Sequence, residues 1–199
     1  MESQISGLFL YNSELKFNEI EKKLNVRSNK LAYHLKKLIS QGILAKKEDI
    51  YSLAENSEPI VPYLSEKKAA LPVVIIHIGD KNSAFLIKRE KRPYQNKVSL
   101  PAGRLILGES IEQATKRIMK EKYGIDARFR SLHSISLEHV KKGNKILHSF
   151  LLIFVSANSK NIRLTNIEKS RKNIIKSDYL LLKKHLSLSA KIHKINSKT

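Results

Sequence analysis

The chain has 199 residues, which accommodates one large domain or two small ones, and it has no cysteine, which excludes disulfide bonds and thiolate metal sites. Its formal charge of +20, from 38 Lys and Arg against 18 Asp and Glu, favours an anionic partner. No apolar run approaches the roughly 18 to 20 residues that span a bilayer, so we expect a cytoplasmic protein without a membrane partner.

The positive charge is uneven along the sequence. Residues 1–56 carry nine basic and seven acidic side chains, which leaves 29 basic and 11 acidic side chains in the rest. A compositional preference for Lys could also produce this excess. The charge therefore indicates a phosphate-bearing partner only where other features agree with it.

The first part of the chain predicts two helices and a hairpin. Residues 15–24 have partly helical apolar spacing, and residues 25–27 interrupt it. Ser28 can cap a second helix, whose apolar side chains are Leu31, Leu35, Leu38 and Ile39. After Gly42, residues 43–44 and 50–53 predict two strands around a polar tip. This order of elements predicts a winged helix.

Residues 28–38 and the following Gly42-Ile43-Leu44 resemble the ArsR-like winged-helix family of prokaryotic regulators, over about a quarter of the chain. In that family the second helix enters the major groove of double-stranded DNA, and Lys, Arg, Ser and Asn suit phosphates and base edges. The resemblance implies DNA-binding residues on this helix and, for the two lysines, at the wing tip: Arg27, Ser28, Asn29, Lys30, Tyr33, His34, Lys37, Lys46 and Lys47. A protein-interaction module is the alternative.

Residues 56–71 contain prolines, serines and charges that predict a connection, with a boundary near residue 65. The apolar run 60–64 favours an ordered segment and a homodimer contact. Beyond it, residues 73–78 and 84–89 predict two strands joined by a turn at 79–82, and thus a β-hairpin.

A second motif follows. Leu100-Pro101-Ala102-Gly103-Arg104 precedes Gly108-Glu109-Ser110 and a predicted helix from Ser110 to Tyr123, which Gly124 ends. This spacing resembles the Nudix box, with matches at Gly103, Glu109, Arg117, Met119, Glu121, Gly124 and Ile125. The resemblance implies a sandwich fold and hydrolysis of a diphosphate with Mg²⁺ held by carboxylates.

The box also departs from the family pattern at four positions. Ala102 replaces a common Gly, and Glu is replaced at Ile106, Ile118 and Lys122. Positions 118, 121 and 122 share one side of the helix, so only Glu121 remains of three carboxylates there. Candidate metal ligands and catalytic residues are then Glu109 and Glu121, with Glu138 or His139 as a conceivable third ligand.

Lys122 suggests a different use of the same site. Its charge can replace that of a metal ion and bind a ligand phosphate, together with Arg89, Gly103 and Arg104. The alternative to a phosphate site is that the Lys122 side chain is exposed to solvent and that Glu109 and Arg117 form a structural ion pair.

The remainder of the chain predicts strands at 128–135 and 146–155 around a basic turn, and a helix over 174–188. His133, His139 and His148 lack short metal-ligand spacing, and we assign them no metal.

We therefore predict an α+β protein, with a winged helix at 1–64, a Nudix-like α/β/α sandwich at 65–190 and a basic tail at 191–199. The favoured function is a dimeric transcriptional regulator that binds double-stranded DNA and senses a nucleotide or phosphate-bearing metabolite. The alternative is an Mg²⁺-dependent Nudix hydrolase of a nucleoside diphosphate derivative with an accessory winged helix. Two modules that bind RNA or a protein partner are the third hypothesis.

Overall fold

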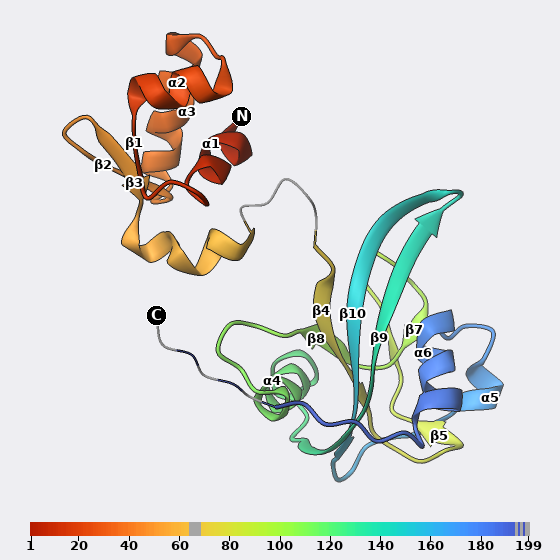
Figure 1. Ribbon diagram of the computed structural model, residues 1–199. Coiled ribbons are helices and arrows are strands. Elements are labelled where there is room, and N and C mark those ends of the chain that lie inside the picture. Colours follow the sequence, from red (N-terminus) through yellow and green to blue (C-terminus); the bar gives the residue numbers. More distant parts are fainter. Residues whose placement is uncertain (64–68, 194, 196, 198–199) are drawn as a thin grey trace. The chain divides into compact units, whose positions relative to one another are not determined.

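A computed structural model describes residues 1–63, 69–193, 195 and 197 of the chain (Figure 1). The chain divides into two compact units, Met1–Ala69 and Ala70–Thr199. The expected boundary near residue 65 lies outside the described residues. Among the helices of the described part, none has the length and apolar character that crossing a bilayer requires.

The first unit combines helices with a three-stranded sheet of order β1-β3-β2. Its elements are α1 (Glu2–Leu8), β1 (Glu14–Lys16), α2 (Phe17–Leu24), α3 (Ser28–Ser40), β2 (Leu44–Lys47), β3 (Ile50–Leu53) and the 3₁₀ helix η1 (Glu55–Tyr63). The three helices α1, α2 and α3 each contribute buried side chains to one core, including Ile5, Ile20 and Leu35.

Several details of this unit differ from the sequence prediction. Helix α1 was not predicted, and Leu15 lies in β1, before the helix that was expected to contain it. Arg27, not Ser28, is the N-cap residue of α3, since its backbone is extended and the helix begins at Ser28, whose hydroxyl donates a hydrogen bond to the Glu21 carboxylate. Helix α3 itself is confirmed.

The hairpin tip is also displaced from its predicted place. Lys46 and Lys47 lie within β2, where they pair with Tyr51 and Ile50 of β3. The chain reverses at Glu48, whose φ of 55° is in the left-handed region. The prediction that the two lysines form the tip was therefore wrong.

The second unit is built on a four-stranded sheet of order β8-β4-β10-β9, in which β4 and β10 are parallel and the other neighbours are antiparallel. These strands are β4 (Leu71–His77), β8 (Ala102–Arg104), β9 (Arg128–Lys142) and β10 (Lys145–Asn158). Two short pairs flank it: β5 (Ser83–Ala84) with β11 (Thr165–Asn166), and β6 (Ile87–Lys88) with β7 (Val98–Ser99). The helices are α4 (Ile111–Tyr123), α5 (Ile167–Ser170), α6 (Lys176–Leu180) and the π-helical turn η2 (Leu181–His185).

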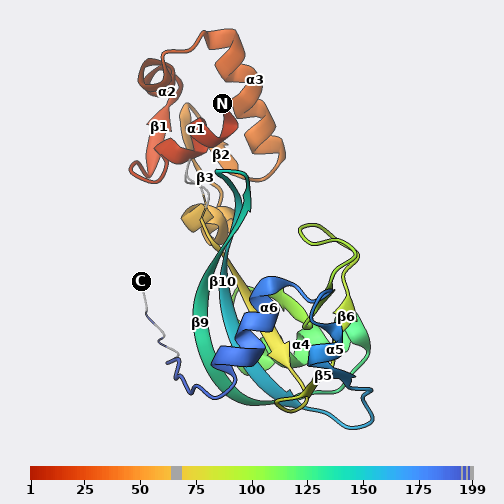
Figure 2. The same cartoon turned by 90° about the vertical axis from the view of Figure 1, so that its right-hand side faces the viewer.

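Helices cover both faces of this sheet, as Figures 1 and 2 show. Side chains alternate between faces along β4 and β10 because the period of a strand is two residues. Val74 and Ile153 pack with Ile118 of α4, whereas the next residues along the strands pack with α5 and η2. The mixed α+β class predicted from the sequence is therefore confirmed.

One predicted element of this unit was wrong, and a second is present with different bounds. Residues 84–89 do not form one strand beside β4: they divide into β5 and β6, which pair with β11 and β7, and only the bridge between Gly79 and Ala84 resembles the expected hairpin. The helix expected over 174–188 starts at Lys176 and changes to π-helical geometry after Leu180.

Helix α4 has well-defined ends, as the sequence predicted. The Ser110 hydroxyl accepts from the Gln113 amide at 3.2 Å, and the Gln113 side chain accepts from the Ser110 amide at 2.8 Å. Gly124 ends the helix with a φ of 67°, and its amide donates to the Lys120 carbonyl at 3.0 Å. This local chemistry positions α4 against the sheet.

Gly103 allows β8 to lie close to α4. A Cβ atom at this position would be 2.6 Å from Ile118 Cγ1 and 2.8 Å from its Cδ1. Ile118 is fully buried and cannot move away without displacing the core around it. A side chain at Gly103 would therefore push β8 and α4 apart.

We predict that Gly103→Ala lowers the free energy of unfolding by about 1–3 kcal/mol, because overpacking forces backbone shifts. Urea denaturation measures this loss. In an Ile118→Ala background the cost of Gly103→Ala should shrink, since the atoms that clash are absent. Strictly additive effects in this double-mutant cycle would show that the two positions are not coupled.

Candidate active site

Two cavities lie side by side beside β8 and the end of α4, and Arg89 and Ala102 line both of them. The larger has a volume of about 580 Å³ and is lined by Ile87, Lys88, Arg89, Glu90, Lys91, Ala102, Lys122 and Tyr123. The smaller, of about 80 Å³, includes Tyr94, Glu138 and Asp178. The larger cavity thus contains four cationic side chains and one carboxylate.

Lys122 is anchored at the larger cavity. Its Nζ donates a hydrogen bond to the Ala102 carbonyl at 2.6 Å, across the gap between α4 and β8. Partial burial of the ammonium group lowers the pKa of Lys122, and the charges of Arg117, Arg89 and Lys91 lower it further. Accumulated positive charge of this kind favours an anionic ligand.

Glu109 and Arg117 form a two-point ion pair. Arg117 Nε and Nη2 both donate to the Glu109 carboxylate, the latter at 3.0 Å, and Nη2 also donates to the Arg104 carbonyl at 3.0 Å. Hydrogen bonding from Arg117 holds the pKa of Glu109 below its usual range, and the Ile106 amide adds to this effect. The pair joins the loop after β8 to α4, so Glu109 has a structural role here.

The residues present do not fit a metal ion held by protein carboxylates. Glu109 is engaged by Arg117, and Ile118 is buried in the core, not facing a site. Glu121 is 62% exposed and lies 3.4 Å from Arg117. Across the described residues, no three His, Asp or Glu side chains come together as a metal-binding group. Mg²⁺ in phosphate sites is usually bound by one or two carboxylates together with waters and substrate phosphates, and Glu121 is at most one such carboxylate here.

The suggested third ligands lie elsewhere. Glu138 accepts a hydrogen bond from the Tyr94 hydroxyl at 3.0 Å in the smaller cavity. His139 is exposed and its Nδ1 lies 2.9 Å from the Ser149 hydroxyl. Of the predicted ligand-binding residues, the structure brings Arg89 and Lys122 together, with Arg104 close enough to affect the pKa of Lys122. Gly103 is buried against α4 and does not line the cavity.

The buried carboxyl of Asp178 was not predicted from the sequence. Its Oδ2 accepts from the Leu100 amide at 2.8 Å, and burial raises its pKa to about 7, with a smaller contribution from the charge of Glu138. Burial likewise raises the pKa of Tyr94 to about 12, assisted by Glu138. The one signal in the sequence was an acidic residue inside an apolar helical pattern.

The predicted DNA-binding residues of the first unit are partly engaged within it. His34 Nδ1 and Lys37 Nζ lie 3.2 Å and 2.7 Å from the same oxygen of Glu2. Ser28 donates to Glu21, and Lys46 lies over the Tyr51 ring, 5.5 Å from its centroid. The exposed members of the set include Asn29, Lys30 and Tyr33.

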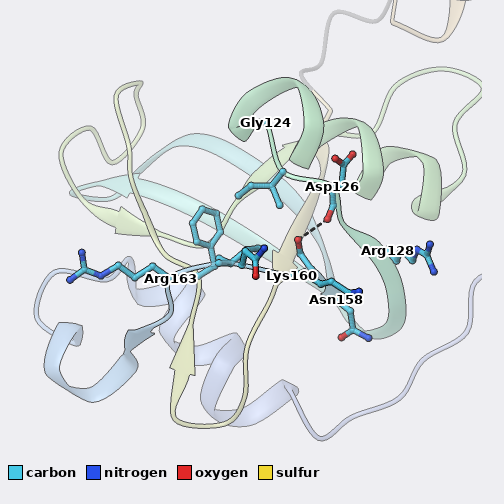
Figure 3. A pocket seen from close by; sticks show the side chains of 11 residues that line it. Gly124, Asp126, Arg128, Asn158, Lys160 and Arg163 are labelled. Carbon is cyan, nitrogen blue, oxygen red and sulfur yellow. Dashed lines mark hydrogen bonds between the residues drawn. The ribbon is translucent and has the colours of Figure 1, made fainter.

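A third cavity, of about 890 Å³, lies between the segment after α4 and the segment after β10 (Figure 3). The Ser159 hydroxyl joins these segments through a 2.6 Å hydrogen bond to the Asp126 carbonyl. The charged side chains of this cavity do not converge, since Arg128 and Arg163 extend in opposite directions in Figure 3. The charged side chains around Lys122 do share one cavity, beside β8 and α4, and we place the candidate active site there.

Comparison with known proteins agrees with the motif around α4. Residues 68–183 match the model of the NUDIX domain. The chain belongs to the NUDIX family. It is 30% identical, over 82 residues, to human "8-oxo-dGDP phosphatase NUDT18", a match that covers 41% of this chain and 25% of the relative. The chain thus spans about a quarter of the length of that curated relative.

Solved structures with a similar fold include a NUDIX hydrolase from Nitrosomonas europaea, at 20% identity over 53% of this chain and 78% of the other, with a TM-score of 0.45. Another is the NUDIX domain of Shewanella oneidensis NrtR complexed with ADP ribose, at 16% identity over 59% of this chain and 86% of the other, with a TM-score of 0.43. Neither likeness identifies a substrate for this chain.

The favoured function from the sequence, a DNA-binding transcriptional regulator with an effector-binding domain, was wrong. The family match covers more than half of the chain, and the curated relative is named as a phosphatase. These findings fit the alternative better than the regulator.

The raised pKa of Asp178 predicts how stability depends on pH. Because the folded-state pKa, about 7, exceeds the ordinary 3.8, folding favours the protonated carboxyl, and this contribution is lost as pH rises from about 4 through 7. The difference corresponds to on the order of 4 kcal/mol. Asp178→Asn should remove this contribution while keeping an acceptor for Leu100. Urea denaturation of both proteins at several pH values measures it, and parallel pH profiles would contradict the assignment.

Proposed function

We propose that the second unit is a Nudix-type hydrolase that cleaves a diphosphate linkage in a nucleoside diphosphate derivative. One observation carries this proposal: the cationic cavity formed by Arg89, Lys91 and Lys122 lies beside the strand and helix that contain the Nudix motif. A diphosphate brings several negative charges, and this cavity supplies cationic donors that neutralise them.

The cations have a catalytic role in this proposal. Water attack on phosphorus places additional charge on the phosphate and leaving-group oxygens, and fixed cations stabilise that charge. Arg89 is oriented by its Nε, which donates to the Pro93 carbonyl at 3.1 Å, and among the described residues the other N–H groups of its guanidinium have no hydrogen-bond partner and can bind a ligand.

Glu121 is the candidate general base. It follows Arg117 by one helical turn and is 62% exposed, whereas Glu109 is 11% exposed and engaged in its ion pair. Glu121 does not line the larger cavity itself, but it precedes Lys122 in the sequence and is accessible, so it can accept a proton from an attacking water.

We further infer that the first unit is an accessory winged helix. The order α1, β1, α2, α3, β2, β3 and the three-stranded sheet support this assignment. The hydrolase proposal does not depend on it, because every residue of the cavity belongs to the second unit.

We predict that the full chain releases product from at least one member of a panel of nucleoside diphosphates and nucleoside-diphosphate-linked sugars. Glu121→Gln should lower kcat by about 10²- to 10⁴-fold, because it removes the proton acceptor, and should leave KM nearly unchanged. Ion-exchange chromatography of the reaction products measures both constants.

Glu112→Gln is the matched control, since Glu112 is an exposed carboxylate in the first turn of the same helix. It should retain wild-type kcat. If no compound of the panel is cleaved, with or without MgCl₂, the hydrolase proposal fails.

A further inference from the structure

We propose that Lys122 and its cationic neighbours replace the metal ion of this Nudix-type site, so that the diphosphate is bound by side chains alone. The inference rests on the proposed function, since it concerns how the same cavity holds the same group. It adds a claim that can be measured separately, namely that binding of the diphosphate does not depend on Mg²⁺.

The first argument is the loss of the ligand set. Ile118 occupies a fully buried position against Gly103, so that position offers no oxygen ligand. Glu109 is committed to Arg117 by two hydrogen bonds. Of positions 109, 118, 121 and 122, Glu121 is then the one that offers an exposed carboxylate, the lower limit of the one or two carboxylates that bind Mg²⁺ with substrate phosphates.

The second argument is the position of the Lys122 ammonium group. It is fixed 2.6 Å from the carbonyl of Ala102, and Lys122 and Ala102 both line the larger cavity. An ammonium group has three N–H donors, and Ala102 is its one hydrogen-bond partner among the described residues. Two donors therefore remain for phosphate oxygens in the larger cavity.

The third argument is the charge that surrounds this group. Lys88, Arg89 and Lys91 line the same cavity, and Glu90 is the one acidic side chain among its lining residues. Arg104 and Arg117 add positive charge nearby, as their effect on the pKa of Lys122 shows. Such surroundings repel a divalent cation and attract a diphosphate without one.

Isothermal titration of the full chain with ADP and with inorganic pyrophosphate, in EDTA and in MgCl₂, tests the inference. We expect both ligands to bind in EDTA, with MgCl₂ changing the affinity by less than about threefold. Lys122→Glu should weaken binding in EDTA by about tenfold or more, the effect of losing a charge-assisted hydrogen bond.

Lys116→Glu is the matched control, because Lys116 lies on the same helix and lines a different hollow, with Glu112 and Asp126. It makes the same change of charge and should leave the affinity within about threefold of wild type. Circular dichroism and urea denaturation show whether each variant is folded. Lys122→Glu also places a second carboxylate beside Glu121, so MgCl₂ should partly restore its affinity for ADP.

The outcomes separate this inference from the function on which it rests. Binding of ADP by the wild type only in MgCl₂, or equal losses in Lys122→Glu and Lys116→Glu, would overturn the metal replacement while leaving hydrolysis intact. Binding in EDTA that depends on Lys122, without turnover of any compound, would support the replacement and overturn the hydrolase.

Discussion

The close packing of β8 on α4 is the constraint on which the rest of the site depends. It is possible because position 103 has no side chain, and Ile118 fills the space that a Cβ atom would need. At this separation, carbonyl groups of β8 come within reach of α4. Lys122 then binds the carbonyl of Ala102, and Arg117 binds that of Arg104. Packing in the core therefore determines where the charges at the surface are held.

The acidic residues of the motif consequently divide into two roles. Glu109 is fixed by Arg117 and by the Ile106 amide, and it closes the loop between β8 and α4. A carboxylate with this many donors stabilises the loop more than it could serve a ligand, since breaking the pair would remove the two hydrogen bonds that join the loop to α4. Glu121 has one long contact with Arg117 and stays accessible. The same sequence motif thus supplies one structural and one reactive carboxylate.

The features that could be predicted from the sequence are those that local chemistry determines, such as the ends of a helix. The ends of α4 follow from a capping box at Ser110 and a left-handed residue at Gly124, and both act within one helical turn. Strand pairing is different, because residues 84–89 are apolar enough for a hairpin with β4 but pair with distant segments instead. Local periodicity carries no information about that choice.

The functional residues show the same limit. Lys122 and Arg89 could be selected from their chemistry and from the motif. The small cavity could not be predicted, because Asp178 reaches it only when the segment before α6 pairs with Val98 of β7. Its burial depends on the contact with Leu100, 78 positions earlier in the chain. Likewise, helical spacing predicts that position 118 lies on the same side of the helix as 121 and 122. In the structure residue 118 packs into the core beneath β8, where an apolar side chain is required.

Electrostatics then decides between a metal-assisted and a cation-lined site. Two unit charges 4 Å apart interact by about 4 kcal/mol at an effective dielectric constant of 20. Three helical carboxylates without a metal would repel a diphosphate by several times this amount, which is why such a site needs a divalent cation. Here one carboxylate is replaced by Ile118 and another by Lys122, and the cavity wall adds Arg89 and Lys91. The sign of the potential is therefore reversed, and a diphosphate is attracted to the residues themselves.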